Sequence, residues 1–322
     1  MPYLPDTTAF AFPPFSTPYP PGVLRTLAST TPAVAAVLTE ADRLLAGLGQ
    51  QPVSPPLTST TPAPARSRET EYVHNLVSAT LVPYSLYLAL DPRSRPSILL
   101  GHGAGFNVAT LITGLMTLAE TIDILITGFL EAQELSLEGG MLALGVPQGT
   151  ARAMCRKVSE GGLHIGMINT VSQTVVCGLF DDLEKLERHA RLNGVPCHRL
   201  GALLPLHTPL FTAAASRAIR KQQDRTVPAV WPPVYLTTVC RPLVESDTVH
   251  EMSVTIWTKP ADLVESVTDL QENYGVNHFV EINATPTLTP MIIQNARPGT
   301  RVDGPAPGVT DAADLVALLN AA

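Results

Sequence analysis

Apolar and polar residues along the chain follow two different periods, and most of the expected elements come from that pattern. The apolar run TTAFAF at residues 7–12 ends at a Pro-Pro pair, which predicts a strand followed by a stop. Helical spacing of apolar residues covers residues 23–45, with a break at its Thr-Pro step, and returns over residues 69–90. Between these helices, residues 51–66 are rich in Pro, Ser and Thr, which predicts a surface loop or a disordered segment.

A strand, a tight glycine turn and a helix follow one another directly in the next segment. Ser97–Leu100 is a short apolar strand, GHGAG forms the turn, and FNVATLITG begins a helix. This order is the architecture of a nucleophile elbow, where a helix dipole and free backbone N–H groups converge. The apolar stretch at residues 108–130 is interrupted by Glu120 and Asp123, so it predicts buried helices rather than a membrane span.

The pattern changes after residue 137. Residues 138–203 give the order strand, helix, strand, strand, helix, strand, which is the ferredoxin-like unit. Helices and strands then alternate to the end of the chain, through the strand NHFVEI and a helical tail. We therefore predict an α/β fold with a large α/β-hydrolase-like domain containing a parallel sheet, formed by residues 1–137 and 204–322. The ferredoxin-like segment would be a small subdomain inserted into it.

Composition narrows the functional classes. The chain has 322 residues, 45% of them hydrophobic, which is enough for one large core with an inserted lobe. With a net charge of -7 and no run of five basic residues, it lacks the electrostatic footprint of a nucleic-acid-binding protein. The amino-terminal segment has no basic region followed by an apolar run, so we expect a cytoplasmic protein that does not bind membranes.

The 4 cysteines show no CxxC spacing and no accompanying histidine pattern, so they predict scattered thiols rather than a metal site or a disulfide framework.

Five motifs occur in an order that resembles the malonyl-CoA:acyl-carrier-protein transacylase family over nearly the whole chain. Two are helical stretches, GVLRTLASTTPAVAAVLTEADRLL and RETEYVHNLVSATLVPYSLYLAL. GHGAG stands where that family has GHSxG, PLHTPLF stands where it has a PFHSPLM-like histidine motif, and HFVEI matches a late strand. The resemblance implies a two-step relay, in which an elbow serine takes an acyl group from a thioester and passes it to the phosphopantetheine thiol of an acyl carrier protein.

The chain departs from the family at three positions that the resemblance marks as functional. Gly103 occupies the serine position, so no acyl-enzyme can form there. The family's PGQGSQ loop is replaced by PPFST at residues 13–17, and prolines have no N–H to donate to an oxyanion. The family's carboxylate-binding arginine falls at or near Gly128, so a malonyl carboxylate would find no cationic partner and a neutral acyl chain would fit better.

The candidate catalytic residues are His207, at the family's general-base position, and His102, beside the vacated nucleophile position of Gly103. For His102 we favour packing and hydrogen bonding within the elbow over a catalytic role. The residues that the resemblance places around an oxyanion or substrate are Ala104, Phe15, Ser16, Gly128, Asn169 and Gln173. Asn169 and Gln173 are also explained as residues that end strands and cap turns.

A relocated nucleophile is an alternative, and the residues that could supply it are Cys155, Cys177, Cys197, Ser172 and Ser16. Buried cysteines in apolar runs are usually inert.

Two functional hypotheses follow. In the first, the chain acts on thioesters linked to acyl carrier proteins in polyketide or fatty-acid biosynthesis, with His207 activating water or the acceptor directly. In the second, it is an inactive acyltransferase-like protein that serves as a docking or scaffold partner for a carrier protein. Neither needs a bound cofactor or metal, because the phosphopantetheine thioester is the substrate handle. A third interpretation, an inactivating substitution at Gly103, would leave the altered PPFST loop unexplained.

Overall fold

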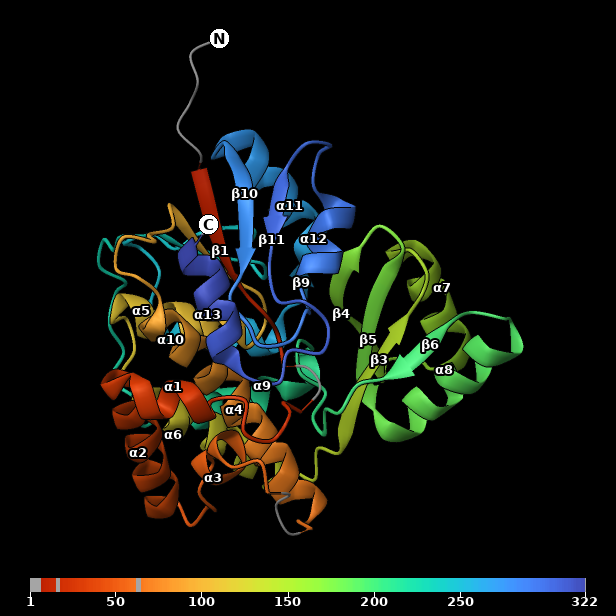
Figure 1. Ribbon diagram of the computed structural model, residues 1–322. Coiled ribbons are helices and arrows are strands. Elements are labelled where there is room, and N and C mark those ends of the chain that lie inside the picture. The colour runs from red at the N-terminus through yellow and green to blue at the C-terminus, as the bar shows by residue number, and fades with distance from the viewer. Residues whose placement is uncertain (1–6, 16–17, 62–64, 322) are drawn as a thin grey trace.

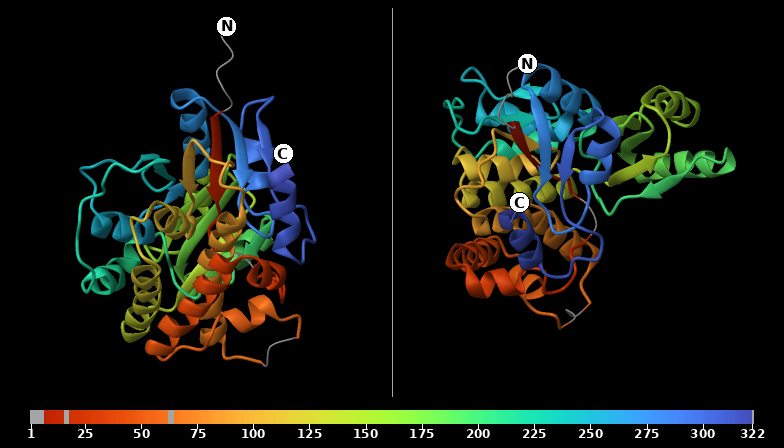
Figure 2. Two further views of the ribbon diagram at one scale, coloured as in Figure 1. Left: turned by 60° about the vertical axis from the view of Figure 1, so that its left-hand side comes forward. Right: turned by 45° about the horizontal axis from the view of Figure 1, so that its top comes forward.

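The computed structural model describes residues 7–15, 18–61 and 65–321. It consists of a large α/β part and a smaller lobe that projects from one side of it (Figures 1 and 2). Each part is organised around its own sheet. This confirms the expected α/β class with a ferredoxin-like insertion. Ser16 and residues 62–64 lie outside the described residues.

The larger sheet has the strand order β11-β10-β1-β2-β7-β8. Its strands are β1 (Thr7–Phe12), β2 (Ile98–Gly101), β7 (Val234–Leu236), β8 (Arg241–Pro242), β10 (Val276–Glu281) and β11 (Arg301–Asp303). Neighbours from β11 to β7 are parallel, and β8 is antiparallel to β7. The central strand β1 therefore has parallel neighbours on both sides and places its carboxyl end, the start of the first loop, beside the end of β2.

Alternation along β1 explains how both faces of this sheet are buried. Phe10 and Phe12 belong to the main core cluster, whereas Ala9 and Ala11 belong to a second cluster on the opposite face. The second cluster is completed by residues from α11 (Leu263–Asn273) and α12 (Thr289–Asn295).

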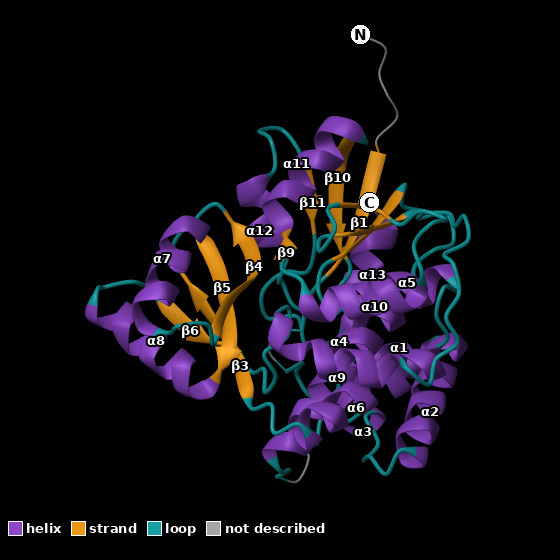
Figure 3. Cartoon of the chain, turned by 180° about the vertical axis from the view of Figure 1, so that it is seen from behind, coloured by secondary structure: helices purple, strands orange, loops and turns teal. Residues whose placement is uncertain are grey.

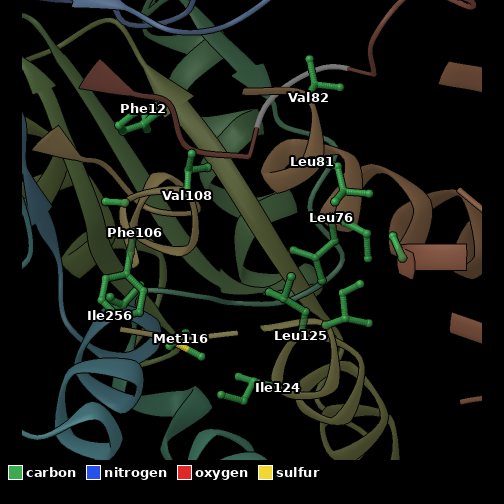
Figure 4. Packing of buried hydrophobic residues seen from close by; sticks show 14 of the residues in the cluster. Phe12, Leu76, Leu81, Val82, Phe106, Val108, Met116, Ile124, Leu125 and Ile256 are labelled. Carbon is green, nitrogen blue, oxygen red and sulfur yellow. The ribbon is translucent and has the colours of Figure 1, made fainter. Parts of the chain in front are cut away.

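The main core is formed by many helices, and Figure 4 shows side chains from several of them meeting below Phe12. The remaining helices of the large part are α1 (Arg25–Thr30), α2 (Pro32–Gly47), α3 (Ser54–Thr58), α4 (Arg68–Ala89), α5 (Gly105–Thr113), α6 (Leu118–Glu134), α9 (Thr212–Ile219), α10 (Val249–Thr258), α13 (Ala312–Ala321) and the 3-10 turn η1 (Pro209–Phe211). The expected break at the Thr-Pro step is the junction between α1 and α2, where Pro32 is the first residue of α2.

The smaller lobe has the ferredoxin-like strand order β6-β3-β5-β4, with two helices on one face. Its elements are β3 (Gly139–Leu144), α7 (Gln148–Val158), β4 (Leu163–Thr170), β5 (Gln173–Leu179), α8 (Phe180–Leu192) and β6 (Cys197–Arg199). Met141, Met167 and Cys177 point from the other face of this sheet into the main core. The lobe is therefore packed against the large part.

A fifth strand of the small sheet comes from outside the predicted insertion. Strand β9 (Ala261–Asp262) follows α10 and pairs in parallel with β4, with Met167 opposite Ala261. The two residues of this strand carry no signal of their own, because the pairing depends on β4, which lies about a hundred residues earlier. The strand joins the small sheet directly to the segment that carries Lys259.

Residues 51–66 differ from the surface loop or disordered segment expected for them, because α3 lies within this stretch. Asp42 on α2 holds the start of α3, accepting hydrogen bonds from the backbone of Val53 and Ser54 at 2.7 and 3.0 Å. Val53 and Leu57 are buried in the core. The two prolines that suggested a loop sit at the first turn of the helix, where a missing N–H has no cost.

Candidate functional site

The GHGAG turn forms a sharp connection between β2 and α5. The backbone N–H of Gly105 donates to His102 O at 3.1 Å, and that of Phe106 donates to Gly103 O at 3.1 Å. Gly103 has a φ of 55°, in the left-handed region that favours glycine. The His102 N–H donates to Phe12 O at 3.1 Å, which fixes the turn against the end of β1. The predicted elbow architecture is present.

The nucleophile position itself is closed. A Cβ atom placed on Gly103 would lie 3.0 Å from Pro14 Cβ and 3.4 Å from Met167 Cε. Pro14 belongs to the PPFST loop and Met167 to β4, so both halves of the molecule converge on the elbow. A side chain at position 103 would therefore be crowded both by the first loop and by the small lobe.

Two other candidate residues flank the closed elbow. Ala104 is half-buried at the start of α5, and its backbone N–H makes no hydrogen bond with any residue the structure describes. Phe15 stacks at a tilt on Tyr72, with ring centroids 5.4 Å apart. Tyr72 in turn contacts the ring of Phe129 at 5.6 Å. The first loop thus ends in an aromatic cluster, while the N–H after Gly103 remains a free donor.

His207 is buried, with 3% of its surface exposed, and its backbone is left-handed with a φ of 60°. Its N–H donates to Trp257 O at 2.7 Å. Its Nδ1 lies 3.1 Å from the carbonyl oxygen of Lys259, and a carbonyl only accepts, so Nδ1 carries the proton. Burial lowers the pKa of His207 to about 4. The imidazole is therefore neutral at pH 7, with the lone pair on Nε2, which is the form a general base needs.

His102 is fully buried beside it. Its Nδ1 lies 2.9 Å from Thr237 Oγ1, and the Thr237 hydroxyl donates to Gly101 O at 3.4 Å, so His102 Nδ1 is the donor to Thr237. Burial, with His207 adding to the effect, lowers the pKa of His102 to about 3, although the Asn169 side chain opposes the shift. Its Nε2 forms no hydrogen bond of normal geometry within residues 7–15, 18–61 and 65–321. These contacts favour the packing interpretation of His102.

Asn169 and Gln173 lie at the turn between β4 and β5 and bind each other. The Asn169 Nδ2 donates to Gln173 Oε1 at 2.9 Å, and Asn295 Nδ2 donates to Asn169 O at 2.8 Å. The Oδ1 atom of Asn169 is buried and unpaired within the described chain. These contacts are typical of residues that end strands, and the unpaired Oδ1 of Asn169 is a buried acceptor near His102.

Trp257 occupies the space next to Gly128, the position that the resemblance gives to an arginine. A Cβ atom on Gly128 would lie 2.6 Å from Trp257 Cη2. The indole packs edge-on against Phe211, with centroids 5.5 Å apart. An aromatic ring therefore lies where the resemblance would place a cation.

Burial deactivates three of the four cysteine thiols, and the fourth, Cys197, is half-buried at the start of β6. Burial raises the pKa of Cys155 to about 11 and that of Cys240 to about 12, and it raises the pKa of Cys177 still further. Thiols with raised pKa values stay protonated at pH 7 and are poor nucleophiles. The exposed Ser172 lies in the β4–β5 turn, 3.4 Å from the Thr170 hydroxyl. This arrangement does not support a relocated nucleophile at these positions.

The site also contains two residues that the sequence did not point to. Trp257 lies against Gly128, and the carbonyl oxygen of Lys259 accepts from His207. No motif marks them, since each contact joins positions far apart in the chain. In the described part of the chain no helix is long and apolar enough to cross a membrane, and no three His, Cys, Asp or Glu side chains group as metal ligands.

Comparison with known proteins agrees with this architecture. No protein-family model matches the chain. One component of the phenolphthiocerol/phthiocerol polyketide synthase of Mycobacterium tuberculosis is 25% identical over 212 residues, which cover 64% of this chain and 11% of that protein. The 6-methylsalicylic acid synthase of Aspergillus niger is 22% identical over 201 residues, which cover 62% of this chain and 11% of the relative. The match thus spans about a tenth of the length of these relatives.

Solved structures match nearly the whole chain. The loading acyltransferase from the avermectin modular polyketide synthase superposes with a TM-score of 0.81 at 18% identity, covering 97% of this chain and 98% of that one. The acyltransferase domain from module 8 of the salinomycin polyketide synthase gives 0.79 at 21% identity, covering 98% and 75%. The malonyl CoA-acyl carrier protein transacylase from Coxiella burnetii gives 0.78 at 19% identity, covering 98% and 96%. The chain therefore has the fold of these acyltransferases.

Proposed function

We propose that this chain is an acyltransferase-type module of polyketide or fatty-acid biosynthesis that binds a carrier-linked acyl thioester without forming an acyl-enzyme. The observation that carries the proposal is the closed elbow. Gly103 has no nucleophilic atom, and Pro14 and Met167 crowd the position that a side chain there would take. Covalent acyl transfer needs a nucleophile within reach of a base, and the described thiols near the site are protonated.

The acyl group in this proposal is neutral. Trp257 and Phe211 form an apolar wall beside Gly128, and a malonyl-type carboxylate would lose its hydration there without gaining a cation. The phosphopantetheine arm of an acyl carrier protein would deliver the acyl group. The similarity to acyltransferase domains of polyketide synthases supports this class of partner.

His207 favours a second candidate function, direct hydrolysis or one-step transfer of the thioester. Its Nδ1–H is held by Lys259 O, so the neutral ring can accept a proton at Nε2. In hydrolysis, the attacking water would lose its proton to Nε2 while its oxygen adds to the thioester carbonyl. The intermediate would then break its C–S bond, and the leaving phosphopantetheine thiol would take the proton back from Nε2. The free N–H of Ala104 is a donor that could stabilise the resulting oxyanion.

A two-part experiment distinguishes binding from chemistry. An acyl carrier protein bearing octanoyl-phosphopantetheine is mixed with the chain, and binding is measured by fluorescence anisotropy while intact-protein mass spectrometry follows both partners. The proposal expects saturable binding, no acyl mass on this chain, and the same affinity for His207→Ala. Acyl mass on this chain would contradict it. Loss of the acyl mass from the carrier that stops in His207→Ala would establish the second function, and no binding would overturn both.

A further inference from the structure

A second candidate site is a cavity that His207 lines and the elbow residues do not. Its volume is about 650 Å³, within the ~300–1,000 Å³ range of small-molecule sites. It is bounded by α7, the first half of β4, and the segment that joins α10 to β9. His207 lines it, but Gly103, Ala104, Asn169 and Gln173 do not. Figure 3 shows α7 on the outer side of the small sheet, away from the elbow helix α5.

The direction of β4 separates this cavity from the elbow. Leu163, His164 and Ile165, at the start of the strand, line the cavity. Met167, further along, reaches the space above Gly103, and Asn169 lies near its end. Because each residue of a strand advances it by about 3.3 Å, the start of β4 contacts the cavity while its later residues contact the elbow. Glycine at position 166 brings His207 against the middle of the strand, where a Cβ would be 3.5 Å from His207 Cβ.

The lining is apolar at several points. The apolar side chains of the lining come from α7, β4 and two turns that contain proline, and they are Cys155, Leu163, Ile165, Pro209 and Pro260. Cys155 and Leu163 are buried, so they are part of the floor rather than the rim. Such a surface favours an apolar group of a ligand.

The rim is cationic. Arg152 and Arg156 extend from consecutive turns of α7, and Lys259 faces them from the α10–β9 segment. All three are exposed, and none forms an ion pair within the described residues. Glu160 is the one carboxylate of the lining, so cations outnumber it. This contrasts with α8, where Arg188 and Arg191 each pair with a glutamate.

A neutral hydrogen-bonding group lies within the same lining. His164 faces the cavity, and burial lowers its pKa, so the ring is neutral at pH 7. Its Nε2 makes no hydrogen bond with the described chain, which is unusual for a buried ring nitrogen.

We propose that this cavity binds an amphiphilic organic anion, with its apolar part on Cys155, Leu163 and Ile165 and its anionic head between Arg152, Arg156 and Lys259. Two kinds of compound combine an apolar chain with an anionic phosphate in this way. They are alkyl phosphate monoesters and acylated phosphopantetheine compounds. The inference goes beyond the proposed function, because it needs neither a carrier protein nor the elbow. Because His207 forms part of the wall, an occupied cavity would also contact the candidate base.

Isothermal titration calorimetry tests the proposal with two probes, octyl phosphate and octanoyl-CoA, on the full chain. We expect at least one to bind, while inorganic phosphate alone and 1-octanol alone bind about tenfold more weakly or worse. Binding of octyl phosphate would identify a free amphiphile as the ligand type, and binding of octanoyl-CoA alone would identify the acylated phosphopantetheine group. If neither probe binds, the proposal is overturned.

Variants then place the ligand. Arg152→Gln/Arg156→Gln and, separately, Lys259→Gln should each weaken binding about tenfold, since the head group lies between two elements. The control Arg188→Gln/Arg191→Gln removes the same charge from the neighbouring helix and should change affinity less than about twofold. Because all five side chains are on the surface, each variant should fold, which thermal melting checks. Equal losses in the control and the cavity variants would indicate non-specific charge attraction and refute the site. An unchanged affinity in Lys259→Gln would also refute it.

Discussion

The closed elbow makes a quantitative prediction about Gly103→Ala. Gly103 has a φ of 55°, and an added Cβ would lie 3.0 Å from Pro14 Cβ and 3.3 Å from Pro14 Cα. The left-handed conformation costs an L-residue about 1–2 kcal/mol, and forcing a methyl group into filled space typically costs about 1–3 kcal/mol more. We expect Gly103→Ala to lower the free energy of unfolding by about 2–5 kcal/mol.

Gly114 provides a matched control. It also has a left-handed backbone, with a φ of 71°, but an added Cβ there meets nothing within 4 Å. Gly114→Ala should therefore show only the backbone cost of about 1–2 kcal/mol. The difference between the two substitutions, about 1 kcal/mol or more, isolates the contact with Pro14 and Met167.

Equilibrium urea unfolding at pH 7 measures both variants, and a Pro14→Gly background completes the test. Pro14→Gly removes the contacting ring, so the Gly103→Ala cost should fall toward that of Gly114→Ala in this background. Comparing the two costs cancels the effect of Pro14→Gly on the unfolded chain. If Gly103→Ala costs no more than Gly114→Ala, or costs the same with and without the Pro14 ring, the elbow is open and the proposed non-covalent function loses its main support.

Three further predictions concern the surrounding structure. The unfolded chain protonates His102 near its ordinary pKa of 6.5, but burial lowers the folded value to about 3. The free energy of unfolding should therefore fall as pH drops below 6.5, by up to about 1.4 kcal/mol per pH unit from this residue. In urea unfolding between pH 6.5 and 5, His102→Gln should show a shallower dependence of stability on pH. Equal slopes in the two proteins would rule this out. Gly128→Ala should lower the free energy of unfolding by about 1–2 kcal/mol, because the added methyl group meets Trp257, although alanine has the better helix propensity. Trp257→Leu should remove most of that penalty. A more stable Gly128→Ala protein would show that the ring does not fill this space. Buried Glu281 accepts hydrogen bonds from the Thr289 backbone and hydroxyl, both at 2.7 Å. Glu281→Gln should lower the free energy of unfolding by about 2–3 kcal/mol, because it places an amide donor against these donors. An unchanged melting temperature in calorimetry would refute this role.

The sequence by itself determined the order of elements and the location of the elbow. Alternation in TTAFAF, the Thr-Pro break, the glycine turn and the β-α-β-β-α-β order each depend on neighbours along the chain, so local periodicity was enough to place them. Gly103 and His207 came instead from the resemblance of GHGAG and PLHTPLF to motifs of a known family. The local signals failed at residues 51–66, where α3 forms because Asp42 and the core hold a Pro-rich segment that has little helix preference of its own.

Only the tertiary structure decided what surrounds those positions. Pro14 and Met167 close the elbow from segments about ninety and sixty residues away, and Trp257 fills the space beside Gly128 from a different helix. The same holds for β9, whose pairing with β4 brings Lys259 toward Arg152 and Arg156 across the second cavity. A missing side chain can be read from one position in a sequence. Whether the space it leaves is empty or filled depends on side chains distant in the chain, whose packing is fixed by the whole fold.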